Sequence, residues 1–182
     1  MSGKLVFIGM PAGGSLVDGA ESFRRSHAGL KVRWVKPGNL HLTLVAPWEC
    51  RDVGPVCRAI NEAAVGLAPV EVLFDTVSFG SDPRRPRLIW ATGPAPDLLK
   101  ELSWLLQAVP GVQEEHRRAF LLHLTIARFN AHDLQAMASK KLCTPVEWRG
   151  TFDTICLYES FMKPGGVEYV ELCRAPFTPF EK

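Results

Sequence analysis

One pattern of chemically active side chains, a histidine and a threonine separated by a leucine, occurs twice. The first copy is Leu40-His41-Leu42-Thr43-Leu44, and the second is Leu122-His123-Leu124-Thr125-Ile126. In an extended chain, residues i and i+2 share a face, so each copy presents an imidazole beside a hydroxyl. Such a pair, present twice, indicates acid–base chemistry on an anionic group.

The types of these four side chains suit the cleavage of a phosphodiester. A neutral imidazole can accept a proton from a nucleophile, and a protonated imidazole can donate one to a leaving group. Hydroxyl groups can donate hydrogen bonds to the non-bridging oxygens of a phosphate. The sequence therefore predicts His41 and His123 as a catalytic pair and Thr43 and Thr125 as phosphate ligands.

Two other interpretations of the repeated pattern are weaker. Each histidine taken alone is equally well explained as a buried side chain satisfied by the neighbouring hydroxyl. Two copies with matching flanks, however, indicate an internal duplication. A zinc site normally has a third protein ligand, and no Asp, Glu, Cys or third His lies at a sequence spacing from either copy that is typical of metal ligands. We therefore expect neither a metal nor another cofactor.

Both motifs fall in stretches whose alternating apolar and polar residues predict strands, at residues 40–46 and 119–128. Strands are also predicted at 4–10, 32–36, 69–79, 86–92, 144–159 and 168–177, and helices at 15–27, 52–65, 96–109 and 133–141. Strands and helices alternate without the continuous apolar runs of a parallel sheet. The expected fold class is therefore α+β with antiparallel sheets.

The composition limits the class of protein further. The chain has 182 residues, of which 47% are hydrophobic, and a formal net charge of +2, which favours one ordinary globular domain spanning 1–182. No apolar run is long enough for a membrane-spanning helix, and the apolar stretch at the N-terminus is too short for a signal peptide. Five widely spaced cysteines form no C-x-x-C pair. We expect a cytoplasmic protein with reduced thiols and no membrane partner.

The two motifs resemble the signature of the two-histidine (2H) phosphoesterase superfamily. Within it, the chain is similar to the RNA 2′,3′-cyclic phosphodiesterases, which are also called 2′-5′ RNA ligases. The resemblance covers nearly the whole chain. It is carried by segments 5–9, 33–35, 39–44, 86–90, 123–128, 157–160 and 165–172.

This resemblance implies a bilobal fold in which two pseudo-symmetric lobes, each an antiparallel sheet backed by helices, surround a central cleft. Each lobe would contribute one His-x-Thr motif. The implied activity is metal-independent opening of RNA 2′,3′-cyclic phosphate ends to a 2′-phosphate, with 2′-5′ ligation as the reverse reaction. His123 would be the base acting on water and His41 the acid for the leaving 3′-oxygen. Arg128 would add a charge-assisted contact to the phosphate.

The implied partners are RNA or nucleotide 2′,3′-cyclic phosphate ends, tRNA fragments among them, bound by a monomer. One departure affects the contacts to the base. After the first motif the family continues with Phe and then Leu-Gly, whereas this chain reads Val45-Ala46-Pro47-Trp48. Trp48 would then replace the missing aromatic by stacking on a nucleobase.

Two alternatives remain open at the level of the sequence. The first is a two-histidine phosphodiesterase acting on a small cyclic nucleotide, an ADP-ribose cyclic phosphate or a 2′-5′ oligoadenylate. The second is a non-catalytic module that binds RNA ends. The intact histidine and threonine in both motifs argue against the binding module.

Overall fold

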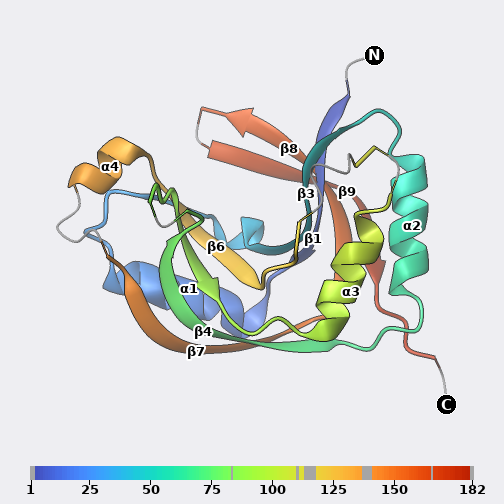
Figure 1. Cartoon of the computed structure of the whole chain (residues 1–182), viewed down its shortest axis with the longest axis horizontal. Helices are drawn as coiled ribbons and strands as arrows, with labels where there is room; N and C mark the ends of the chain where they lie inside the picture. Colours follow the sequence, from blue (N-terminus) through green and yellow to red (C-terminus); the bar gives the residue numbers. More distant parts are fainter. Residues whose placement is uncertain are drawn as a thin grey trace.

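The computed structural model describes residues 3–82, 84–109, 111–112, 118–136, 141–164 and 166–180. Its strands are β1 (Lys4–Pro11), β2 (Arg33–Trp34), β3 (His41–Cys50), β4 (Val70–Gly80), β5 (Leu88–Thr92), β6 (His123–Arg128), β7 (Cys143–Phe152), β8 (Thr154–Lys163) and β9 (Gly166–Pro176). Its helices are α1 (Gly14–Ser26), a short 3-10 turn (Pro37–Asn39), α2 (Gly54–Ala64), α3 (Asp97–Leu106) and α4 (Ala131–Ala136). The antiparallel α+β class predicted from the sequence is confirmed (Figure 1).

In the described part of the chain, the strands form one sheet in the order β7-β4-β5-β6-β3-β1-β8-β9, with β2 paired to β6. The central neighbours, β3 and β6, share a single register pair, Leu42 with Leu124. We call β3-β1-β8-β9 the first half-sheet and β7-β4-β5-β6 the second. The two motif strands therefore meet in the middle, where the halves join.

Two helices, α1 and α3, connect the half-sheets, because each follows a strand of one half-sheet and packs on a strand of the other. Helix α1 follows β1 of the first half-sheet but packs on β7 of the second. Helix α3 follows β5 of the second half-sheet but packs on β3 of the first, next to α2, which lies on β8 and β9 (Figure 1). The apolar stripe of α3 is buried as its spacing predicts, at Leu99, Leu102 and Leu106.

The internal repeat extends to strand register. Next to the motifs, β1 and β3 pair in the same way as β5 and β6, with one extra residue on the motif strand in each pair. The β1–β3 pair contains a second extra residue farther along, between the partners of Val6 and Ile8. The equivalent partners are Met10–Leu42 and Ala91–Leu124, Gly9–Thr43 and Trp90–Thr125, and Ile8–Val45 and Ile89–Ala127. The extra residues are Leu44 and Ile126, each directly after the threonine of its motif. Two matched β-bulges thus mark the same position in both copies.

Some boundaries differ from those predicted. The segment predicted as one strand, 144–159, is two strands that lie far apart in the sheet, because the chain leaves β7 at Asp153 and crosses to β1. Strand β6 begins at His123 rather than at residue 119. Helix α2 begins at Gly54, whose N–H donates to Asp52 Oδ1 over 3.0 Å. Residues 137–140 of the predicted helix 133–141 lie outside the described residues.

Among the helices that the structure describes, none combines the length and the apolar character needed to span a membrane.

Candidate active site

The four motif side chains lie together on one face of the sheet, around the Leu42–Leu124 contact. The antiparallel register places the position of His41 opposite Thr125 and that of Thr43 opposite His123. All four are half-buried, whereas the alternate apolar residues of both motifs are at most 3% exposed. The structure therefore brings together the histidine and threonine pairs that the sequence singled out.

Both imidazoles are held in the same way by the backbone of their own strand. His41 Nδ1 lies 2.7 Å from the carbonyl oxygen of Asn39, and His123 Nδ1 lies 3.0 Å from that of Leu121. A carbonyl oxygen can only accept a hydrogen bond, so Nδ1 carries the proton and donates it in each ring. In the neutral tautomer, Nε2 is then the free basic nitrogen of both histidines.

Burial shifts the acid–base behaviour of both rings. Desolvation lowers the pKa of His41 to about 4, and the charges of Arg128 and His123 lower it as well. Desolvation also lowers the pKa of His123, with a further contribution from Arg128. The hydrogen bonds to Asn39 and Leu121 act in the opposite direction because they stabilise the charged rings. The empty site thus favours neutral imidazoles, and a bound anion would favour their protonation.

The remaining polar groups of the site are available to a ligand. Within the described residues, the hydroxyls of Thr43 and Thr125 make no side-chain hydrogen bond, and Arg128 makes no ion pair. Arg128 is exposed at the end of β6 and is electrostatically coupled to both histidines. Two hydroxyl donors and one guanidinium around a pair of imidazoles form a set that suits a phosphate.

The β-bulges explain how Arg128 reaches this site. Simple alternation from His123 and Thr125 would direct residue 127 to the same face and residue 128 to the other. The extra residue at Ile126 changes that alternation, so that Ile126 and Ala127 are both buried and Arg128 is exposed. The equivalent position after the bulge of the first motif is Ala46, which has no charge. The cation therefore comes from one half-sheet only.

Different aromatic rings surround the two histidines. His41 lies against Phe7, at 4.8 Å between ring centroids, and against Tyr169, at 5.1 Å in an edge-on arrangement. His123 lies against Trp90 at 5.3 Å, and the indole N–H of Trp90 donates to Ser78 Oγ over 3.2 Å. The sequence analysis identified none of these rings as part of the site. The period-2 pattern of strand 86–92 places Trp90 on a face, but only the pairing with β6 shows that this face carries His123.

Trp48 does not occupy the position that base stacking requires. Its side chain is 4% exposed and belongs to the hydrophobic core, and its strand position pairs with Val6. The motif strand continues to Cys50, and its two register shifts cancel in the alternation, so Trp48 faces inward like Leu42 and Leu44. The expected stacking role of Trp48 therefore does not fit this placement.

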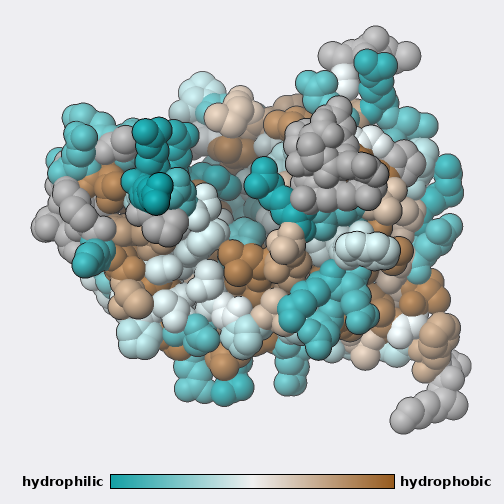
Figure 2. All heavy atoms as spheres, in the orientation of Figure 1, coloured by the Kyte–Doolittle hydropathy of each residue, from teal (hydrophilic) through white to brown (hydrophobic). Residues whose placement is uncertain are grey.

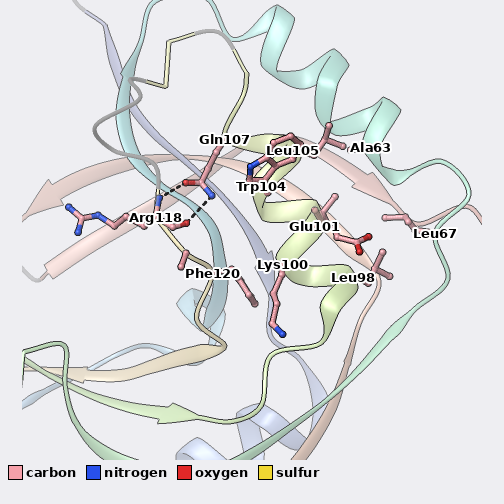
Figure 3. A pocket seen from close by; sticks show the side chains of 12 residues that line it. Ala63, Leu67, Leu98, Lys100, Glu101, Trp104, Leu105, Gln107, Arg118 and Phe120 are labelled. Atoms are coloured by element: carbon pink, nitrogen blue, oxygen red, sulfur yellow. Dashed lines mark hydrogen bonds between the residues drawn. The ribbon is translucent and has the colours of Figure 1, made fainter.

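On the face shown in Figure 2, the surface is hollowed between the two half-sheets, and hydrophilic residues gather around the hollow. A larger and mainly apolar pocket of about 830 Å³ lies elsewhere, between α2 and α3, and includes Trp104 and Leu105 (Figure 3). Gln107 closes one side of that pocket through hydrogen bonds to the backbone of Arg118. None of the motif residues lines it, so its size does not identify it as the catalytic site.

No cluster of three or more His, Cys, Asp or Glu side chains suited to a metal ion occurs among the residues that the structure describes.

The fold of the described residues is similar to that of solved phosphoesterase structures. The family model described as LigT like phosphoesterase matches residues 8–90, which include the first motif and the strand of Trp90. The matched segment is thus similar to the LigT-like phosphoesterases, in line with the resemblance that the motifs carry.

Three solved structures illustrate the shared fold. TT0787 of Thermus thermophilus is 20% identical, with a TM-score of 0.76 over 97% of this chain and 98% of that one. LigT of E. coli in its apo form is 18% identical, with a TM-score of 0.73 over 98% and 99%. E. coli LigT complexed with 3′-AMP is 20% identical, with a TM-score of 0.70 over 97% and 99%. No curated protein sequence matches the chain.

Proposed function

We propose that this protein hydrolyses 2′,3′-cyclic phosphate ends of RNA to 2′-phosphates without a metal. One observation carries the proposal: two imidazoles, each with Nδ1 held by its own strand, lie on one face with two threonine hydroxyls. Arg128 adds a positive charge coupled to both rings. This arrangement supplies a base, an acid and phosphate ligands in one place.

In the proposed reaction, the phosphate oxygens accept hydrogen bonds from Thr43 and Thr125, and Arg128 balances their charge. One neutral histidine takes a proton from water at Nε2 as the water oxygen forms its bond to phosphorus. The bond from phosphorus to the 3′-oxygen breaks. The other histidine, protonated at Nε2, gives its proton to that oxygen, leaving a 3′-hydroxyl and a 2′-phosphate. With the 5′-hydroxyl of a second RNA in place of water, the same steps form a 2′-5′ linkage.

The test is hydrolysis of a short RNA ending in a 2′,3′-cyclic phosphate in the presence of EDTA, with wild type compared with His41→Ala and His123→Ala. We expect a 2′-phosphate product from wild type and a loss of at least about a hundredfold in rate in each variant. His27→Ala provides the matched control, because His27 lies at the end of α1, stacked on Phe23.

Four results would contradict the proposal. Wild-type rates in either motif variant would remove the histidines from the mechanism. A loss of activity in EDTA that zinc restores would indicate metal catalysis. Turnover of small cyclic nucleotides but not of any RNA would favour the small-molecule alternative, and binding of cyclic ends without turnover would favour a binding module.

A further inference from the structure

A pocket of about 370 Å³ adjoins the histidine site. One of its walls is the segment from Arg33 to Asn39 with the end of β6, and the other is the β8–β9 hairpin. The first wall belongs with the second half-sheet, because Arg33 pairs with Arg128, whereas the hairpin belongs to the first half-sheet. Asn39 joins the walls by donating from Nδ2 to the carbonyl oxygen of Val167 over 3.1 Å.

Three residues belong to both the pocket and the histidine site. The carbonyl oxygen of Asn39 holds the His41 ring, and the Tyr169 ring lies edge-on against it. Arg128 lines the pocket and acts electrostatically on both histidines. A molecule that filled the pocket would therefore be continuous with one bound at the histidines.

The lining of this pocket combines positive charge with aromatic surface. Its cations are Arg33, Lys36, Arg128 and Lys163, and no carboxylate is among the lining residues that the structure describes. Lys163 is paired with Glu168 just outside the lining, whereas the other three cations have no ion pair in the described part of the chain. The aromatic surfaces come from Trp34 and Tyr169. Sites for single-stranded nucleic acid typically combine cations that contact the phosphates with aromatic rings that stack on the bases.

We propose that this pocket binds the penultimate nucleotide of an RNA whose 2′,3′-cyclic end occupies the histidine site; this inference rests on the function proposed above. A cyclic end is connected to the rest of the RNA only through its 5′-oxygen, so the next unit in the chain is the penultimate nucleotide. The pocket volume is within the range of sites for small organic ligands. The cations would contact the phosphodiester, and Trp34 or Tyr169 would contact the base.

The kinetic test compares two substrates, adenosine 2′,3′-cyclic phosphate and the dinucleotide ApA with the same cyclic end. We expect wild type to show a kcat/KM about tenfold or more higher for the dinucleotide. The double variant Arg33→Ala/Lys36→Ala should lose most of this advantage and keep mononucleotide turnover within about twofold. Lys100→Ala is the matched control, because Lys100 is an exposed cation on α3, away from the pocket. Equal turnover of both substrates by wild type would overturn the inference.

A calorimetric binding test separates this inference from the proposed reaction, because it needs no turnover. The ligands are 2′-AMP and ApA with a terminal 2′-phosphate. The dinucleotide should bind more tightly to wild type. The slope of the logarithm of its binding constant against the logarithm of the salt concentration should be steeper by about 0.7 for each added phosphate contact. The double variant should bind both ligands alike. If the protein showed this binding pattern but hydrolysed neither substrate, the inference about the pocket would be supported and the proposed hydrolysis would be refuted. Equal weakening of both ligands in the variant would refute the pocket.

Discussion

At the scale of single residues, Arg128, after the second motif, is a cation that acts electrostatically on both histidines of the proposed catalytic pair. We expect Arg128→Ala to lower kcat/KM about 10- to 1000-fold, because it removes a charge-assisted contact to the phosphate. Arg128→Lys should restore part of this loss. The measurement is steady-state kinetics on the cyclic-ended RNA. Arg149→Ala serves as the control, since Arg149 is exposed and paired with Glu147. Full activity of the alanine variant would exclude a phosphate contact.

The two histidines should differ in role, and the packing around their rings indicates which one is the acid. Burial lowers the pKa of both rings, and His41 is enclosed by Phe7 and Tyr169 whereas His123 lies against Trp90, so we expect the first proton in the empty site to bind to His123. We therefore expect His123 as the acid and His41 as the base, the reverse of the roles implied by the family resemblance.

A substrate with sulfur in place of the 3′-oxygen tests these roles, because a thiolate leaves without a proton donor. His123→Ala should recover much of its lost rate on the sulfur substrate, and His41→Ala should not. Recovery in His41→Ala alone would restore the roles that the resemblance implies.

At the scale of elements, the pairing of β1 with β3 controls the position of the first histidine. Gly9 lies opposite Thr43, and a Cβ there would meet the carbonyl oxygen of Leu42 at 2.8 Å and His41 Cδ2 at 3.4 Å. We expect Gly9→Ala to lower the free energy of unfolding by about 1–3 kcal/mol and to reduce kcat, because the backbone must shift. Denaturant unfolding and kinetics measure both effects. Gly13→Ala, where a Cβ meets nothing within 4 Å, should change neither.

The motif strands and the face that carries their polar side chains could be predicted from the sequence, because polar residues and buried leucines alternate in both motifs with a period of two. The same signal explains why His41, Thr43, His123 and Thr125 were identified together. It could not reveal the bulges, which depend on which strand pairs with which, nor Trp90 and Tyr169 as neighbours of the histidines. The stacking role expected of Trp48 fails for a different reason, since the period of two itself puts Trp48 on the buried face of Leu42 and Leu44.

At the scale of the whole molecule, the buried neutral histidines make stability depend on pH. His41 in the unfolded chain binds a proton near pH 6.5, whereas in the folded protein it does so only near pH 4. Between these values the unfolded state binds more protons, so stability falls as the pH falls.

We expect His41 to account for a loss of about 3 kcal/mol between pH 7.5 and pH 4. Urea unfolding of wild type and His41→Gln over this range measures the contribution as a difference between the two curves. Parallel curves would show that the pKa of His41 is not lowered by folding.

The matched bulges carry a consequence for substrate orientation. A cleft with perfect two-fold symmetry could accept a phosphodiester in either of two opposite directions, and half of the binding events would present the wrong oxygen to the acid. In this protein Arg128 stands where the other repeat has Ala46, and Trp90 stands where it has Gly9. These two differences between equivalent positions of the repeats therefore make the two ends of the cleft chemically different. In the proposed reaction, this asymmetry would let the site distinguish the 2′ side of the substrate from the 3′ side, although its two halves share the same strand pairing.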